Sequence, residues 1–184
     1  MARALPSTVL VEGTLAKAMV KAAAEMEGPV YIRFGRSAVP VFHDEDYKFE
    51  IGKGVLLRDG SDITVVATGL MVNEALIAAD TLAAEGISVR VINIHTIKPL
   101  DTELICKAAK ECGTIVTAEE HSIIGGLGSA VAEAVCEGCP VPVRRIGVND
   151  TYGHSGPAVD LLKQFGLSAE HIAEVVREAV KAKA

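Results

Sequence analysis

Short apolar runs alternate with amphipathic segments along most of the chain, and this pattern predicts the elements of its main domain. Apolar residues that recur at helical spacing predict helices at 71–85, 101–113 and 126–137. Compact apolar runs predict strands at 62–68, 87–94, 114–120 and 141–148. Strands that alternate with helices are typical of βαβ units. We therefore expect an α/β protein whose mainly parallel sheet carries helices on both faces.

Residues at the ends of these segments support the predicted helices. Gly86 and Gly113 stand where two of the helices are expected to end, which is a common place for glycine. Asp101 can cap the helix that it precedes. Farther along, Pro157 predicts the start of a short helix, and Ser168 is placed to cap a final amphipathic helix.

The first part of the chain follows a different pattern. A helix is predicted at 14–27, a short strand at 29–34 and a further strand at 49–58. One helix and one strand cannot bury a core of their own. We therefore expect three units: residues 1–36 as the end of a preceding domain, residues 37–50 as a linker, and residues 51–184 as a complete α/β domain.

Composition and charge narrow the classes of function. Ala, Val, Ile and Leu supply most of the 49% of residues that are hydrophobic, which suits buried parallel strands. The net charge is -6 and no cluster of Lys and Arg stands out, so no nucleic-acid partner is expected. No apolar run approaches the roughly 18–20 residues that span a bilayer. Because the first residues also lack the apolar core of a signal peptide, we expect a cytoplasmic protein.

The four cysteines are expected to be reduced structural thiols. Cys136 and Cys139 form one CxxC pair, whereas a zinc site needs two such pairs that converge. Cys106 and Cys112 have poor spacing for the second pair. A redox CxxC would follow a strand and open a helix, but this pair is predicted to close one. We therefore expect no metal site.

The stretch TAEEHSIIGGLGSA, residues 117–130, has the composition of an active site. Its glycines follow a predicted strand and precede a predicted helix, which is the place for an anion site. Neither G-x-G-x-x-G nor a P-loop is present, so the alternative is a tight turn with close helix–sheet packing. Glu119, Glu120 and His121 lie at the carboxyl end of the strand, where open α/β sheets bind ligands. They could support acid–base chemistry or form a polar interface contact.

Two other groups of polar residues are candidates for binding. The segment 149–157 places Tyr152 and His154 after the last strand, where His154 could contact a ligand, although capping and turn formation explain much of the pattern. Arg33 lies within a predicted strand and Arg36 just beyond it. Either could clamp a phosphate through its planar guanidinium, or form a salt bridge at an interface.

Four successive motifs together resemble the transketolase family. They are GPVYIRFGR, FEIGKGVLLRDGSDITVVATGLMVNEAL, GISVRVINIHTIKPLD and TIVTAEEHSIIGGLGSAVAE, and they cover nearly the whole chain. The sequence is most similar to the C-terminal subunit of transketolases that are made as two polypeptides. The resemblance implies a three-layer α/β/α fold with a mostly parallel five-stranded sheet, one antiparallel edge strand and an N-terminal helix–strand remnant.

The resemblance also implies an activity. Transketolases of the pentose phosphate pathway use thiamine diphosphate and Mg²⁺ to move a two-carbon ketol unit between sugar phosphates. The family's GDG…N motif, which binds the metal and the diphosphate, belongs to the other subunit and is absent here. Most of the pyrimidine-binding domain, with the Glu that activates the cofactor, is absent as well. We expect this chain alone to be inactive, to bind neither cofactor nor metal, and to act within a homodimeric enzyme that contains an N-terminal transketolase subunit.

Site residues follow from the resemblance position by position. In the family, an Arg just after the last strand of the pyrimidine-binding domain contacts the substrate phosphate, and Arg36 occupies the matching place. Arg33 is the second choice. Glu119, Glu120, His121 and His154 become interface or ligand-proximal residues rather than catalysts.

Three other functions stay open. The IKPLD and EE…GGLGSA motifs are shared more loosely with 1-deoxyxylulose-5-phosphate synthase and with the β subunit of 2-oxo acid dehydrogenase E1 components. The chain could also be a non-catalytic module that binds a metabolite at the strand ends near Gly125 and His154.

Overall fold

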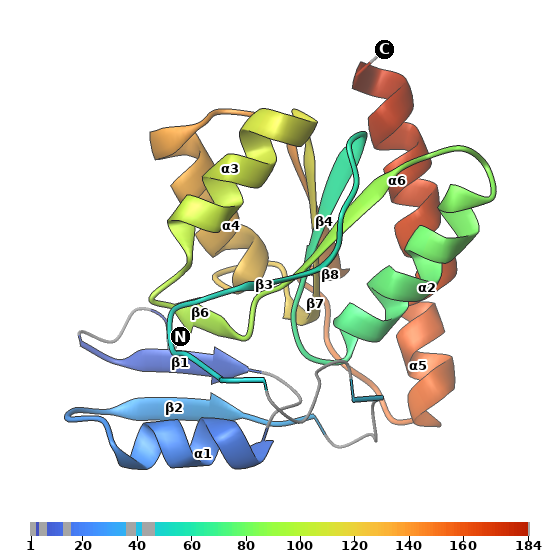
Figure 1. Ribbon diagram of the computed structural model, residues 1–184. Helices are drawn as coiled ribbons and strands as arrows, with labels where there is room; N and C mark the ends of the chain where they lie inside the picture. Colours follow the sequence, from blue (N-terminus) through green and yellow to red (C-terminus); the bar gives the residue numbers. More distant parts are fainter. Residues whose placement is uncertain (1–2, 4–6, 13–15, 36–39, 42–46, 184) are drawn as a thin grey trace.

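The chain forms two sheets, as the computed structural model in Figure 1 shows. The structure describes all residues except 1–2, 4–6, 13–15, 36–39, 42–46 and 184. The larger sheet has five strands in the order β3-β5-β4-β7-β8, and the smaller has three in the order β2-β1-β6.

The five-stranded sheet confirms the predicted fold. Its strands are β3 (Val55–Arg58), β4 (Ile63–Ala67), β5 (Val89–Asn93), β7 (Ile115–Ser122) and β8 (Val143–Val148). Strand β3 pairs antiparallel with β5 at one edge, and the other pairs are parallel. Every residue of β4 is buried, as expected of a central strand covered on both faces.

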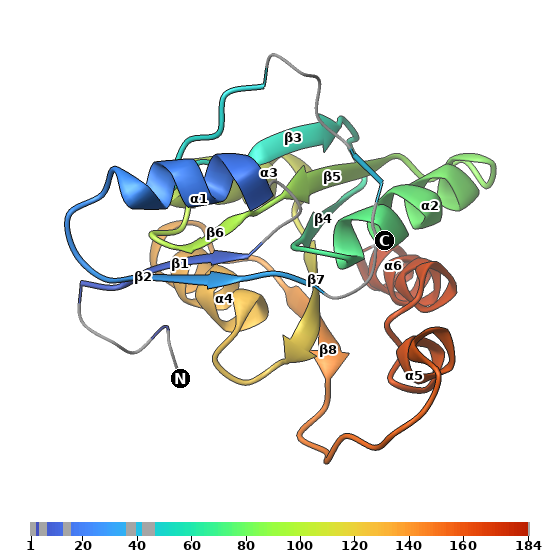
Figure 2. The same cartoon turned by 90° about the horizontal axis from the view of Figure 1, so that it is seen from below.

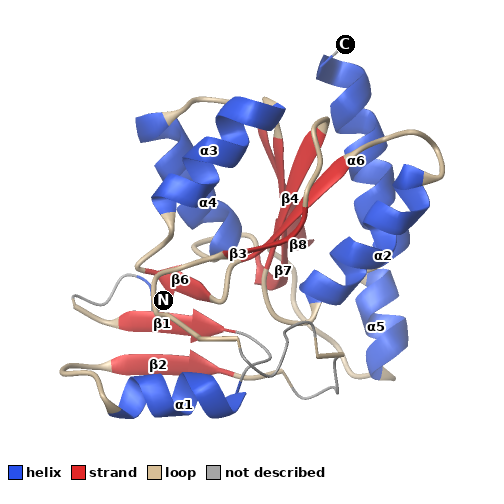
Figure 3. Cartoon of the chain, viewed as in Figure 1, coloured by secondary structure: helices blue, strands red, loops and turns tan. Residues whose placement is uncertain are grey.

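Helices cover both faces of this sheet, which gives the predicted three layers (Figure 3). On one face, α2 (Met71–Ala83) packs with the final helix α6 (Ala169–Lys183). On the other, α3 (Thr102–Cys112) packs with α4 (Leu127–Gly138). The predicted caps are present: Asp101 accepts the backbone N–H of Leu104 at 3.1 Å, and Ser168 accepts that of His171 at 3.4 Å. The short helix α5 (Ala158–Gln164) buries none of its residues.

The prediction of a single helix and a single strand in the first part of the chain was wrong. Besides α1 (Ala16–Ala24) and β2 (Val30–Arg33), the structure has β1 (Val9–Glu12). Strand β1 pairs in parallel with β2 and antiparallel with β6 (Thr96–Lys98), which forms between a predicted strand and a predicted helix, where no element was predicted. Because β6 directly follows β5 of the large sheet, this pairing ties the N-terminal unit to the main domain. Figure 2 shows β6 between the two parts.

The strand predicted at 49–58 is shorter than expected, because only Val55–Arg58 forms β3. Phe49 and Ile51 instead pack against the small core of the N-terminal unit, around Val11 and Met19. The N-terminal unit thus shares its core with the chain that leads into the main domain.

Candidate functional site

The large sheet has a topological switch point at the carboxyl ends of β4 and β7. These two strands lie side by side, yet β4 leads into α2 on one face and β7 leads into α4 on the other. Their outgoing loops therefore diverge, and the edge of an open α/β sheet where this happens is the usual place for a bound ligand. This edge is the candidate functional site.

Residues of the N-terminal unit contact this edge of the sheet. Arg33 forms an ion pair with the Glu12 carboxylate, and its Nη2 donates to the carbonyl oxygen of Glu120 at 3.1 Å. The hydroxyl of Thr68, the residue after β4, donates to the carbonyl oxygen of Glu12 at 3.1 Å. The backbone N–H of Glu12 donates to the carbonyl oxygen of His95 at 3.0 Å. Residues at or just after the ends of β4, β5 and β7 are thus all hydrogen-bonded to Glu12 or Arg33, a pair in which Glu12 is buried and Arg33 is partly exposed.

Burial changes the pKa values of the ionisable groups where the N-terminal unit meets the large sheet. The Glu12 residue is only 7% exposed. Burial raises the pKa of Glu12, and the opposing charge and hydrogen bond of Arg33 offset only part of that effect. Burial lowers the pKa of His121, and the positive charge of Arg33 lowers it further. The sequence did not indicate a role for Glu12. It is a single acidic residue at the end of the apolar run VLV.

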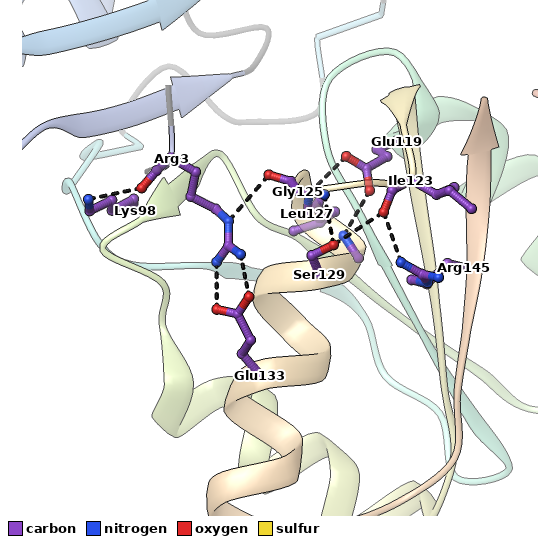
Figure 4. Close-up of polar contacts among 10 residues, drawn as sticks. Arg3, Lys98, Glu119, Ile123, Gly125, Leu127, Ser129, Glu133 and Arg145 are labelled. Carbon is purple, nitrogen blue, oxygen red and sulfur yellow. Dashed lines mark hydrogen bonds and ion pairs between the residues drawn. The ribbon is translucent and has the colours of Figure 1, made fainter. Parts of the chain in front are cut away.

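Glu119 has a different environment, at the start of α4 (Figure 4). Its two carboxylate oxygens accept the backbone N–H groups of Leu127 and Gly128, each at 2.8 Å. Burial raises the pKa of Glu119, and these two hydrogen bonds oppose the rise. The helix N-terminus that was a candidate anion site therefore holds a carboxylate of the same chain.

The backbone conformation and the close packing at this turn explain two of its glycines. Gly125 has a φ of 76°, in the left-handed region that favours glycine. A Cβ atom on Gly128 would lie 2.8 Å from Oγ1 of Thr117 and 2.9 Å from the side chain of Arg145. Of the two interpretations of the Gly-Gly-Leu-Gly stretch, the structure favours the tight turn with close helix–sheet packing.

Long polar side chains hold the loop between β7 and α4, as Figure 4 shows. Arg145 donates to the carbonyl oxygen of Ile123 at 2.9 Å, and Arg3 donates to that of Gly125 at 3.3 Å. Ser129 accepts the N–H of Gly125 at 2.9 Å and donates to the Ile123 carbonyl oxygen at 3.2 Å. The loop is thereby fixed by contacts from β8, from α4 and from near the N-terminus.

The candidate residues divide into three groups in space. Glu120 and His121 line a cavity of about 390 Å³ beside α5, whose other lining residues are mostly apolar. Glu119 lies instead against α4. His154 is exposed, hydrogen-bonds to Gln164 at 2.6 Å and stacks on Phe165 with ring centroids 5.3 Å apart. Their roles near a ligand or an interface stay predictions.

Arg36, the first choice for a phosphate ligand, lies outside the described residues. Arg33 is described, and both of its Nη atoms contact groups of this chain. This salt bridge joins neighbouring strands of the small sheet within one chain, so the alternative interpretation of Arg33 as part of an interface salt bridge also stays a prediction. Its possible role as a phosphate ligand stays a prediction.

The described residues do not fit a thiamine diphosphate site. Among them, no group of three or more His, Cys, Asp or Glu side chains is arranged to hold a metal ion. The α4 N–H groups that could receive a diphosphate go to Glu119. In the part of the chain that the structure describes, no helix has the length and apolar character to cross a membrane.

The CxxC pair closes a helix, as predicted. Cys136 is exposed within α4, and the backbone N–H of Cys139 caps the same helix by donating to Val135 at 3.0 Å. Burial, together with a hydrogen bond to Cys106, raises the pKa of Cys139 to about 11. A thiol with so high a pKa is a poor nucleophile at neutral pH.

Two layers of helices on a mostly parallel sheet, with a second small sheet docked at the switch point, define a doubly wound α/β domain joined to a small N-terminal unit. The chain belongs to the transketolase C-terminal domain family, because the family model described as "Transketolase, C-terminal domain" matches residues 52–172.

Relatives and a solved structure agree with this assignment. The chain is 48% identical over 157 residues to a 6-deoxy-6-sulfo-D-fructose transketolase subunit of Clostridium sp. (strain MSTE9), covering 85% of this chain and 49% of that protein. It is 48% identical to the 1-deoxy-D-xylulose-5-phosphate synthase of Heliobacterium modesticaldum, covering 89% of this chain and 26% of the synthase. A structure described as a split-gene transketolase, inactive beta4 tetramer, matches all of this chain and 60% of its own with a TM-score of 0.93 and 46% identity. The chain thus spans half or less of the length of these two relatives.

Proposed function

We propose that this chain is the C-terminal part of a transketolase, which transfers a two-carbon ketol unit between sugar phosphates with thiamine diphosphate and Mg²⁺. The observation that carries the proposal is the match of the whole chain, N-terminal unit included, to a split-gene transketolase. In this proposal the chain has a structural role in assembly and is inactive alone. The cofactor and its metal are held by the rest of a cytoplasmic enzyme, which dimerises.

The N-terminal unit supports a specific version of this proposal. Within residues 9–33, the described part forms two strands and a helix, and its small sheet is completed by β6 of the main domain. We propose that residues 1–36 belong to a pyrimidine-binding domain, that residues 37–50 are a linker, and that residues 51–184 are the C-terminal domain. The partner is an N-terminal transketolase subunit or domain that supplies the residues for the diphosphate and the metal.

Reconstitution tests the proposal. The chain is co-expressed with the N-terminal transketolase section of the same organism, and ketol transfer from a ketose phosphate to an aldose phosphate is measured with thiamine diphosphate and Mg²⁺. We expect activity from the complex and none from either polypeptide alone. A stable complex that transfers no ketol unit to any sugar phosphate would contradict the proposal.

Arg36→Ala tests the substrate contact within the same complex. If Arg36 binds the substrate phosphate, the variant raises KM for phosphorylated sugars, because a charge-assisted hydrogen bond to phosphate is lost. An unphosphorylated sugar serves as the control, and its KM should not change. A wild-type KM for the phosphorylated sugar would refute the assignment of Arg36.

The identity to 1-deoxy-D-xylulose-5-phosphate synthase supports that activity as a second candidate. Formation of 1-deoxy-D-xylulose 5-phosphate by the reconstituted complex, without ketol transfer between sugar phosphates, would favour it. Co-purification with a lipoyl-bearing protein would instead favour an E1 β subunit, and ligand-induced stabilisation without activity in any complex would favour a metabolite-binding module.

A further inference from the structure

Three of the four cysteines gather around the carboxyl end of α4, on the side of the main domain where α3 and α4 pack together (Figure 1). Cys136 is exposed within α4, and Cys139 directly follows the helix and is buried. Cys106 comes from α3 and is partly buried. The proposed function uses none of these thiols. Their positions in space show which two can react with each other.

The sulfur of Cys106 lies directly against the last turn of α4. Its Sγ donates to the carbonyl oxygen of Ala134 at 3.9 Å. A Cβ atom on Gly138 would lie 2.8 Å from the same sulfur, so the approach depends on the absence of a side chain there. Cys139 is the next residue along the chain, and its thiol is hydrogen-bonded to Cys106. The two sulfur atoms are thus neighbours across the contact between the helices.

Solvent reaches the two members of this pair unequally. Cys106 contributes to the wall of a cavity of about 370 Å³ between α3 and α4, together with residues of both helices such as Thr102 and Glu137. Cys139, by contrast, is only 6% exposed. A small oxidant therefore meets the sulfur of Cys106 first, and Cys139 is placed to react with the product.

Cys136 lies outside this contact although it shares the CxxC motif with Cys139. Position 136 is two residues from both Ala134 and Gly138, which places it about 200° around the helix axis from the face that meets Cys106. Its exposure agrees with that direction. The pair that is close in space is therefore different from the pair that is close in sequence.

We propose that Cys106 and Cys139 are a modification site at which hydrogen peroxide forms a reversible disulfide between α3 and the end of α4. The Cys106 thiolate attacks one peroxide oxygen, the O–O bond breaks, and the products are a sulfenic acid on Cys106 and hydroxide. The sulfur of Cys139 then attacks the sulfenic sulfur. The S–S bond forms, the S–O bond breaks, and the thiol proton of Cys139 leaves with the hydroxide as water. Two electrons pass from the two thiols to one peroxide, and an external dithiol reverses the reaction.

The second step should be slow at neutral pH and faster in alkali. Burial and the hydrogen bond to Cys106 raise the pKa of Cys139 to about 11, so about one molecule in ten thousand carries its thiolate at pH 7. Dimedone, which traps sulfenic acids, should therefore label Cys106 at pH 7, and the disulfide should replace most of that label at pH 9. A ratio of label to disulfide that does not change with pH would overturn the resolving role of Cys139.

Peptide mapping of the 184-residue chain tests the pairing itself. The native chain is treated with hydrogen peroxide, its remaining thiols are alkylated, and it is digested without reduction. A protease that cleaves after glutamate places the four cysteines on separate peptides, with cuts at Glu103, Glu111, Glu133 and Glu137. We expect the Cys106 and Cys139 peptides to be joined, and to separate when dithiothreitol is added.

Three other results of this mapping overturn the proposal. They are a disulfide between Cys136 and Cys139, a disulfide between two chains through Cys136 alone, and oxidation of Cys106 to sulfinic acid with no disulfide. Because the mapping is done on the wild type, it does not depend on the folding of any variant. Cys136→Ser is the matched control and should form the same disulfide, whereas Cys106→Ser should form none.

Thermal unfolding shows whether the disulfide fits the folded protein. Closing the loop between Cys106 and Cys139 should raise Tm by about 5–15 °C relative to the reduced chain. Oxidised Cys136→Ser should show the same rise, and peroxide-treated Cys106→Ser should show none. A disulfide that forms but lowers Tm would mean that the two helices must be distorted to join the sulfur atoms, which would overturn their assignment as a native pair.

Discussion

A Cβ atom on Gly126 would lie 1.9 Å from Oε2 of Glu119, far inside van der Waals contact. The two residues depend on each other, because the carboxylate reaches the first N–H groups of α4 only where residue 126 has no side chain. Their contact connects the end of β7 to the start of α4 and fills the anion site that the glycine-rich sequence suggested.

Gly126→Ala should therefore destabilise the protein by about 2–4 kcal/mol, because the added methyl group must displace a buried carboxylate. Thermal or urea unfolding measures the loss. Gly153→Ala is the matched control: a Cβ atom there has no heavy atom within 4 Å, and its φ lies outside the left-handed region. Equal stability of the two variants would show that the Glu119 contact is not a constraint.

Removal of the carboxylate should open the helix N-terminus to an anion from solution. Glu119→Ala leaves the N–H groups of Leu127 and Gly128 without their acceptor, at a cost of about 1–3 kcal/mol. Sulfate should then stabilise the variant more than it stabilises the wild type, by mass action at the exposed N–H groups. Melting temperatures in sulfate and in chloride at matched ionic strength give the comparison. Glu120→Ala, which leaves the cap intact, should gain no more from sulfate than the wild type does.

Most helices and strands of the main domain could be predicted from the sequence because the patterns that indicate them are local. Each strand and helix of the five-stranded sheet carries its own periodicity and its own end residues, such as Asp101 and Gly113, which act within one turn of helix. The short strands β1 and β6 were missed for the opposite reason. Each has at most four residues, and the pairing of the two strands with each other spans more than eighty positions of sequence, which no local pattern can indicate.

The candidate site was only partly predictable, on the same grounds. Glu119 and the glycines after it were found because they are neighbours in sequence, although the carboxylate was not expected to be the group that fills the turn. Glu12 was missed because its partners Arg33 and Thr68 come to it only through the tertiary fold. A lone acidic residue at the end of an apolar run carries too little information to predict a buried ion pair.

The buried Glu12 should give stability a characteristic pH dependence. Its pKa in the folded protein is raised by burial above the ordinary value of 4.5. Its contribution to stability is therefore fully present below the ordinary pKa and is lost as the pH rises through the raised value. The wild type should lose stability relative to Glu12→Gln as the pH rises above the ordinary pKa of 4.5, by about 1.4 kcal/mol per unit of pKa difference.

Urea unfolding of both proteins across that pH range measures the difference. The variant Glu85→Gln is a control for the direction of this pH dependence. Because the hydrogen bond from Arg177 lowers the pKa of the exposed Glu85, the wild type should gain stability relative to that variant as the pH rises, by a small amount. If the difference in unfolding free energy between the wild type and Glu12→Gln stayed constant across the pH range, the burial of the Glu12 carboxyl group would be contradicted.

The cysteines should react with iodoacetamide in an order set by burial and pKa. Cys139 is buried with a pKa of about 11, so about one molecule in a thousand carries the reactive thiolate at pH 8. Cys136, three residues earlier, is exposed at the end of the same helix. Native protein at pH 8 should therefore be alkylated at Cys136 well before Cys139, as peptide mass spectrometry would detect. Cys136→Ser should remove the fast reaction, and unfolding in urea should make the remaining thiols react at similar rates. Native labelling of Cys139 as fast as that of Cys136 would mean that the end of α4 opens readily, against the packing of Cys139 on Cys106.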